Sequence, residues 1–140
     1  MLRQPESPRA SPDLLRNARA ARAHALGRRA EAAVVIHLEH IGASIVATNL
    51  RVGRLEIDIV AREARVIAVV EVRARGPGAW TTGFGSIDSR KRARIRRAAE
   101  RLWRYRYKSD PSVDRLRIDA ASVIVGEDGD AIVEYVKAAF

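Results

Sequence analysis

The chain has 140 residues, 47% of them hydrophobic, which is enough for one domain with a core of its own. It contains no Cys, and this excludes disulfides, thiolate metal sites and thiol nucleophiles. No apolar run approaches the ~20 residues of a membrane span, and the first residues lack the apolar core of a signal peptide. We therefore expect a cytoplasmic protein with no membrane partner.

The positive charge is concentrated in one segment. The formal net charge is +9, from 26 Lys and Arg against 17 Asp and Glu. Residues 90–108 hold ten basic residues and a single acid, Glu100, so the rest of the chain balances 16 basic against 16 acidic residues. This segment alone carries the imbalance.

The N-terminal part is expected to be an extension of the domain. Residues 1–12 are rich in Pro and Ser, and the Ala- and Arg-rich stretch that follows completes a flexible, basic extension over residues 1–22. Ser11 and Pro12 are a helix-start signal within it. An apolar stripe then predicts a firmer helix over residues 23–41, with Glu31 at the edge of the stripe. The folded domain is predicted to span residues 23–140.

Strand and helix patterns alternate through the rest of the chain. Strands are predicted over residues 43–48, 55–61, 66–75, 115–125 and 131–136, and a helix capped by Ser89 over 89–107. A connecting segment is expected at 49–53, and a long ligand-facing loop at 75–88 with Trp80 and Phe84 as candidate stacking groups. The order α-β-β-β-α-β-β predicts a single α/β domain with a mixed sheet of about five strands flanked by helices.

Acidic side chains occupy the second and third of these strands. A turn over residues 62–65 places Asp58 opposite Val69, and it puts Asp58, Glu71 and Arg73 on one face of the hairpin. Carboxylates in apolar strands are costly unless a cation or a ligand compensates them. This hairpin is therefore the first candidate site.

Two carboxylates on one face of a sheet suit a hard cation such as Mg²⁺ or Mn²⁺. Such an ion polarises a phosphodiester and lowers the pKa of a bound water. Asp58 and Glu71 are the predicted metal ligands, Glu31 is a third, and Arg73 is the cation that steadies the transition state. We name these four residues as candidate catalytic residues.

The basic segment is predicted to bind nucleic acid. Its basic side chains recur at helical spacing away from the predicted buried face, which makes a stripe of one sign of charge. The candidate nucleic-acid-binding residues are Arg90, Lys91, Arg94, Arg97, Arg101 and Arg104. A solvated face that meets an acidic protein is the alternative, with the acids of the hairpin paired to arginines such as Arg51, Arg54 or Arg73.

Several short motifs together resemble the YraN-like family of bacterial proteins, uncharacterised protein family 0102. They are Gly27…Glu31, Asn49-Leu50-Arg51, Glu56-Ile57-Asp58-Ile59-Val60-Ala61, Val70-Glu71-Val72-Arg73, Phe84-Gly85, Arg90-Lys91 and Arg117-Ile118-Asp119. That family is similar to the restriction-endonuclease-like superfamily, which includes archaeal Holliday-junction resolvases. The resemblance implies an endonuclease-like fold, a Mg²⁺-dependent phosphodiesterase on DNA, branched or structured DNA included, and DNA rather than RNA as partner. Because resolvases act as dimers, it also implies a homodimer.

Arg73 departs from the family pattern, which has Lys at this position. Arg keeps the positive charge but is broader, and its pKa above ~12 excludes a role as base. Two explanations stay open: Arg73 still stabilises the transition state, or catalysis has been lost and nucleic-acid binding kept. Lys91 supplies the missing ammonium if the start of its helix reaches the site.

Overall fold

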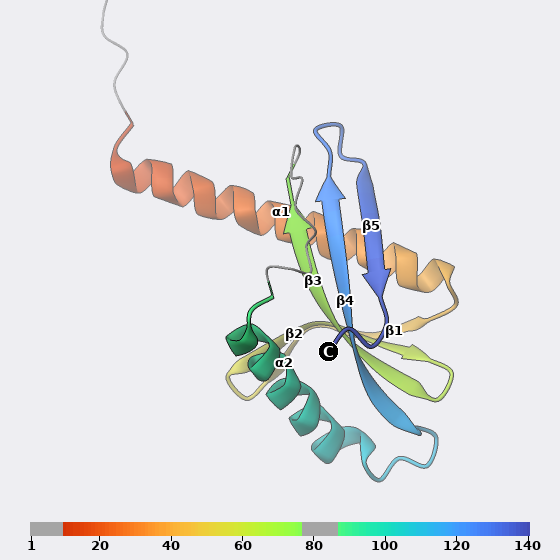
Figure 1. Ribbon diagram of the computed structural model, residues 1–140. Coiled ribbons are helices and arrows are strands. Elements are labelled where there is room, and N and C mark those ends of the chain that lie inside the picture. The colour runs from red at the N-terminus through yellow and green to blue at the C-terminus, as the bar shows by residue number, and fades with distance from the viewer. Residues whose placement is uncertain (1–9, 77–86) are drawn as a thin grey trace, which may run out of the picture.

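The structure, a computed structural model, describes residues 10–76 and 87–140, and it is an α/β domain (Figure 1). In these residues the elements are α1 (Pro12–His40), β1 (Ser44–Val52), β2 (Leu55–Glu63), β3 (Val66–Arg75), α2 (Ser89–Leu102), the π-helical segment η2 (Trp103–Tyr107), β4 (Arg115–Val125) and β5 (Ala131–Val136). The predicted order α-β-β-β-α-β-β is confirmed. Trp80 and Phe84 lie outside the described residues.

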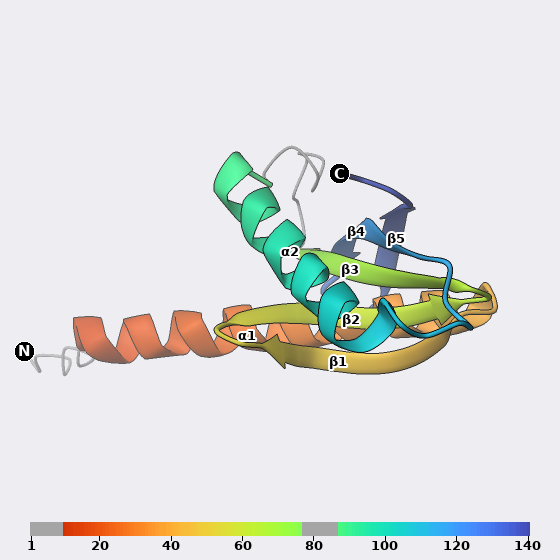
Figure 2. The ribbon, with the colours of Figure 1, turned by 90° about the horizontal axis from the view of Figure 1, so that it is seen from below.

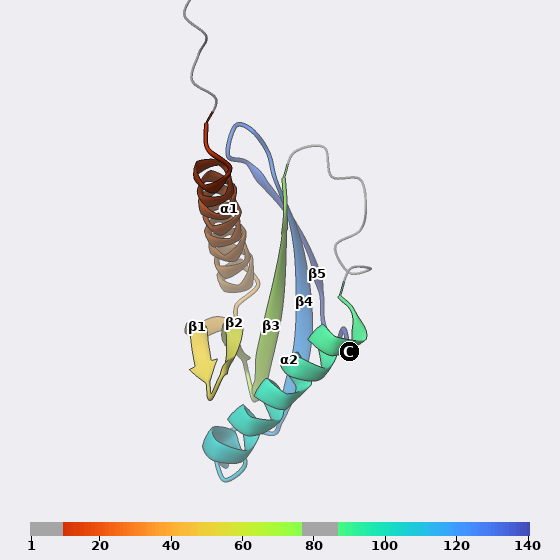
Figure 3. The same ribbon diagram turned by 90° about the vertical axis from the view of Figure 1, so that its left-hand side faces the viewer.

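The strands form one five-stranded mixed sheet in the order β1-β2-β3-β4-β5. All neighbours are antiparallel except β3 and β4, which run parallel and are connected through α2. Helix α1 covers one face of the sheet and α2 the other (Figure 3). Within the described residues, no helix is both long enough and apolar enough to cross a membrane.

Helix α1 is longer than the apolar stripe predicts. It begins at Pro12, where the hydroxyl of Ser11 accepts a hydrogen bond from the Leu14 N–H at 3.3 Å. Its buried residues are Ala30, Val34 and Leu38, one turn apart, so only its C-terminal half packs on the sheet. The N-terminal half extends beyond the strands (Figure 2). The boundary expected at residue 22 thus falls inside a continuous helix.

The connection between β1 and β2 is shorter than predicted. A connecting segment at 49–53 was expected, but β1 continues to Val52, and only Gly53 and Arg54 form the turn. Asn49 adopts a φ of 49° within β1, a conformation that Asn tolerates better than most residues, and pairing resumes at Leu50. Gly53 has a φ of 63°, as a tight turn requires.

The hairpin of β2 and β3 has a two-residue turn, not the four-residue turn predicted over 62–65. Ladder pairing continues to Glu63 and Val66, so Val60, and not Asp58, lies opposite Val69. A residue outside the hairpin stabilises this turn: the Arg65 carbonyl accepts a hydrogen bond from the Asp114 N–H at 2.8 Å. The register shift is two residues, an even number, so each side chain keeps its predicted face.

The residue that caps the N-terminus of helix α2 lies one position earlier than predicted. The carboxylate of Asp88, and not Ser89, caps the helix by accepting the Lys91 N–H at 2.8 Å. The predicted buried face is confirmed: Ile95, Ala98, Ala99 and Leu102 pack against the sheet. The last predicted turns, from Trp103 to Tyr107, are π-helical.

Each face of the sheet has its own apolar core. The core under α1 includes Val34, Leu38, Ile59, Val70 and Val123. The core under α2 includes Ile57, Val60, Ile67, Val69 and Leu102. Along β3, alternate residues point to the two cores, and this alternation places Glu71 and Arg73 on the α2 face.

Asp119, an acid inside β4, is fully buried and fully hydrogen bonded. It accepts the guanidinium of Arg117 at 2.7 and 2.9 Å, the hydroxyl of Tyr135 at 2.6 Å and the N–H of Ala138 at 2.9 Å. Burial and the bond to Asp119 raise the pKa of Tyr135 well above its usual value, so its hydroxyl stays a donor. Asp119 therefore fastens the end of the chain to β4.

Replacing Asp119 is expected to destabilise the fold strongly. Asp119→Ala leaves the guanidinium of Arg117 with one buried partner fewer, and such losses typically cost about 3–5 kcal/mol. The control is Asp114→Ala, which breaks the exposed bridge between Asp114 and Arg65 and should change the stability little. Equal midpoints of the two variants in urea denaturation would contradict this role.

Candidate functional site

Asp58 lies where β2 separates from β3. The paired ladder between the two strands ends at Ile59 and Val70, and Asp58 is the next residue of β2. Its carboxylate accepts the backbone N–H of Val72 at 2.8 Å. The side chain of Asp58 thus satisfies a strand donor where the partner strand has turned away.

Asp58 and Glu71 face each other across this separation. Burial, the nearby charge of Glu71 and, more weakly, that of Glu31 raise the pKa of Asp58 to about 7, against the opposing effect of the Val72 hydrogen bond. Two carboxyl groups so close favour one shared proton or a cation between them.

The cation present at this pair is Lys91. Its Nζ lies 2.7 Å from Oε1 of Glu71, whose side chain is only 9% exposed. Lys91 belongs to the first turn of α2, which Asp88 caps, so the start of the helix does reach the hairpin. We predicted Lys91 both as a nucleic-acid contact and as a substitute ammonium; the structure places it against Glu71.

These groups line a hollow of about 430 Å³, here called the site hollow. Its walls carry two acids of the pair, one further acid, four basic side chains and two apolar ones. They are Asp58, Glu71, Glu56, Lys91, Arg51, Arg54, Arg94, Leu55 and Ile95. A partly enclosed hollow with an acidic base and a cationic rim suits a phosphate ester that approaches a cation.

Glu31 does not line the site hollow. Its Oε2 accepts the side-chain amide of Asn49 at 3.1 Å, and its charge acts on Asp58 from a distance. Among residues 10–76 and 87–140, no group of three or more His, Asp or Glu side chains is arranged to hold a metal ion. Of the predicted metal ligands, the structure therefore brings together Asp58 and Glu71.

Arg73 follows Glu71 on the same face of β3, half-buried, and it is absent from the walls of the site hollow. A cation that pairs with Glu71 is Lys91, from the neighbouring helix.

The basic side chains along this segment are exposed, as predicted. This holds for Arg90, Arg94, Arg97 and Arg101 of α2 and for Arg104 of η2. A second hollow, of about 500 Å³, lies between the turn of β1 and β2 and this helix, and Arg97, Arg101 and Arg104 line it. Arg54 and Leu55 line both hollows, so one basic surface continues from α2 to the carboxylate pair.

Three residues near the site have contacts that the site prediction did not include. Arg51, one of the arginines that the alternative pairs with the hairpin acids, makes an exposed ion pair with Glu56 at 4.0 Å. Arg51 and Arg54, at the Gly53 turn, also line the site hollow, and Asn49 donates a hydrogen bond to Glu31. Two arginines around a glycine turn, next to a strand that carries acids, are the sequence signal that indicates the first two. Asn49 gives no such signal, because its contact joins elements 18 residues apart.

The raised pKa of Asp58 predicts a stability that falls with pH. The folded protein binds a proton at Asp58 more tightly than the unfolded chain does, so this contribution is complete below pH 3.8 and is lost as pH rises through about 7. Asp58→Asn should remove it and stabilise the protein at pH 8 but not at pH 4, by at most about 1.4 kcal/mol per pH unit between the two pKa values. Urea denaturation with a chelator present measures this, and parallel pH profiles of the two proteins would contradict it.

Comparison with known proteins places the chain in a family. Residues 30–123 match the family model described as Uncharacterised protein family UPF0102. A UPF0102 protein of Sorangium cellulosum is 59% identical over 116 residues, which cover 83% of this chain and 81% of that protein. UPF0102 proteins of Desulfitobacterium hafniense and Streptomyces coelicolor are 39% and 35% identical, over 71% and 81% of this chain and 80% and 86% of their own lengths. The chain belongs to the UPF0102 family.

Proposed function

We propose that the protein is a metal-dependent, endonuclease-like phosphodiesterase that acts on DNA, and that Lys91 supplies its catalytic ammonium. One observation carries the proposal: the Lys91 ammonium lies 2.7 Å from Glu71, beside Asp58, in a hollow rimmed by arginines. Two carboxylates and an ammonium at one point are the groups that hydrolysis of a phosphodiester uses.

The carboxylate pair fits a divalent cation. Burial and the nearby charge of Glu71 raise the pKa of Asp58 to about 7, which a bound cation would offset, and both side chains offer the oxygen ligands that Mg²⁺ and Mn²⁺ prefer. With these two protein carboxylates as ligands, water and phosphate oxygens would complete the shell, as is common for Mg²⁺. Bound there, the metal would supply Lewis acidity and an acidified water.

The protein's own side chains have separable tasks in this proposal. Lys91 is a compact cation with three donors, so it can bind a phosphate oxygen in the hollow and offset its negative charge. Arg51 and Arg54 orient the phosphate from the rim. Arg73 lies two residues after Glu71 on β3. In this proposal Lys91 has the catalytic role that the family resemblance gives to a Lys at position 73.

DNA is the substrate that the wider surface favours. The exposed arginines of α2 lie beside the site hollow and are joined to it through Arg54, so a phosphate backbone along the helix leads to the carboxylate pair. Like charges at this density repel each other, and a polyanion relieves that repulsion.

Binding without cleavage is the second candidate. The ion pair of Lys91 and Glu71 already neutralises one carboxylate, and burial favours a proton on Asp58 near pH 7. In that state the site needs no metal, and the protein would hold DNA through α2 alone.

Cleavage assays with Mg²⁺ or Mn²⁺ on plasmid, single-stranded and four-way-junction DNA test the proposal. Lys91→Ala, Asp58→Asn and Glu71→Gln should each lower the rate at least about 100-fold, since each removes a group at the reacting phosphate. Arg28→Ala, an exposed change on α1, is the control and should keep full activity. Arg73→Ala should cost less than Lys91→Ala; the reverse order would return the role to residue 73.

Activity that survives in both Asp58→Asn and Glu71→Gln would remove this hollow from the proposal. DNA binding by the wild type with no cleavage of any of these DNAs under either metal would favour the second candidate.

The salt dependence of DNA affinity tests the role of α2. Removing Arg94, Arg97 and Arg101 together should weaken binding and reduce the slope of log affinity against log salt by about 3, near one per lost phosphate contact. The matched control replaces Arg16, Arg19 and Arg22 of α1, which removes the same charge. If the control variant lost as much of the salt-dependence slope, DNA affinity would depend on the total charge of the protein and not on a contact with α2.

A further inference from the structure

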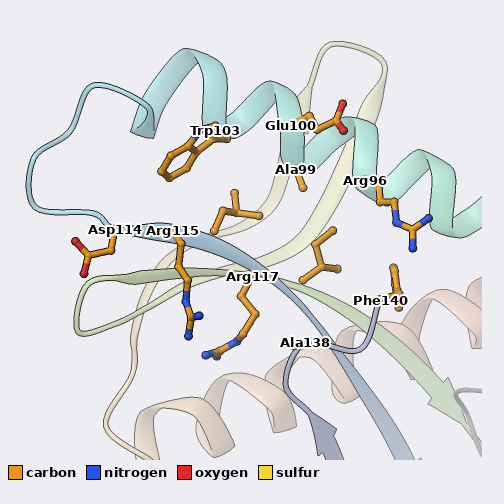
Figure 4. A pocket seen from close by; sticks show the side chains of 11 residues that line it. Arg96, Ala99, Glu100, Trp103, Asp114, Arg115, Arg117, Ala138 and Phe140 are labelled. Atoms are coloured by element: carbon orange, nitrogen blue, oxygen red, sulfur yellow. The ribbon is translucent and has the colours of Figure 1, made fainter.

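A larger pocket lies on the other side of α2 and shares no residue with the site hollow. Its volume is about 630 Å³, within the range of small-ligand sites, and we call it the α2–β4 pocket. It is formed by α2 and η2, the start of β4 and the end of the chain (Figure 4). Nothing in the proposed phosphodiester chemistry uses it.

The interior of this pocket is apolar and partly aromatic. Trp103, Leu116, Ile118 and Phe140 pack only partly against the core and turn their remaining surface to the pocket, with Ala99 between them. Trp103 is also the first residue of the π-helical segment, a distortion that occurs often at functional sites. Such walls take a flat apolar ring and exclude an ion.

One cation is available beside the apolar walls. Arg117 is committed to Asp119 and Glu63, and Asp114 to Arg65. Arg115 lines the pocket from β4, but Figure 4 shows its side chain directed away from α2, and its charge acts on Asp114. Arg96 makes no hydrogen bond or ion pair in the part of the chain that the structure describes, and it lies on α2 beside the pocket. The pocket thus combines a flat apolar interior with one available guanidinium group at its edge.

We propose that the α2–β4 pocket binds an unpaired nucleotide of a DNA strand, with the base against Trp103 and a flanking phosphate on Arg96. A duplex offers its phosphates and the edges of its bases, whereas only an unpaired base exposes a flat apolar face. Stacking on an aromatic side chain accepts every base, so no sequence preference is required. This inference rests on the proposed function, and it specifies DNA with unpaired nucleotides as the substrate class.

The position of the pocket supports a strand over a free nucleotide. Glu100 lines both this pocket and the hollow formed by Arg97, Arg101 and Arg104, so the two adjoin across α2. A backbone that follows these arginines can place a neighbouring base over the helix and into the pocket. The pocket would then hold the unpaired part of a DNA whose phosphates cross to the site hollow.

Fluorescence of Trp103 provides the test. The chain has two Trp residues, so Trp80→Phe leaves Trp103 as the reporter. A short oligothymidylate should quench it, while a blunt duplex of equal length and thymidine monophosphate should not. Trp103→Leu, which keeps an apolar side chain, should lower affinity for the oligothymidylate about tenfold, and Arg96→Ala should lower it as well. Both should leave duplex affinity within about twofold.

Arg28→Ala is again the control, because it removes an exposed charge from α1. Wild-type affinity of both pocket variants for the oligothymidylate, or an equal loss on duplex, would overturn the inference while leaving duplex cleavage and its dependence on Lys91 untouched. Quenching by the monophosphate but not by the strand would overturn it in favour of a free nucleotide. Failure of the wild type to bind any DNA at low salt would overturn both proposals.

Discussion

The contact on which the site depends is the ion pair between Lys91 and Glu71, made at the point where β2 leaves β3. Two strands that stayed paired would close this space with ladder hydrogen bonds. Because the strands separate at Asp58, its carboxylate accepts the hydrogen bond of the Val72 N–H. The separation also leaves room beside Glu71 for the side chain of Lys91 from α2. The charge of Glu71 is thus compensated by a cation from a second element of the fold.

Helix α2 serves several surfaces because its sides differ in chemistry. Ile95, Ala98, Ala99 and Leu102 bury one side, and this burial offsets the mutual repulsion of the arginines on the exposed side. Lys91, in the first turn of α2, points toward the hairpin. Trp103, the residue directly after α2, lines the α2–β4 pocket. Substitutions along α2 are therefore separable: those of the buried side affect stability, and those of exposed arginines affect contacts.

The sequence predicted the elements well and the register less well. The sequence pattern located β4 and β5 at their observed bounds, because β4 is a continuous buried run between turn residues and β5 alternates between exposed and half-buried residues. The β2–β3 turn was wrong, since Arg65 is held by Asp114 and Pro111, and contacts across ~50 residues leave no local pattern. The same limit applies to the site: Asp58 and Glu71 were visible as acids in apolar strands, but the reach of Lys91 depends on how α2 crosses the sheet.

Under the proposed function, the catalytic ammonium comes from Lys91 on α2, so a phosphodiesterase site is compatible with Arg at position 73. A Lys on β3 would be fixed relative to Glu71 by the strand itself. Lys91 is fixed instead by α2, the helix that also carries the arginines proposed to contact DNA, and its backbone N–H is held by Asp88. Under the proposed function, contact of DNA with α2 and the position of the ammonium are therefore mechanically linked. A strand position has no such link, so under the proposed function the site does not need a Lys at residue 73.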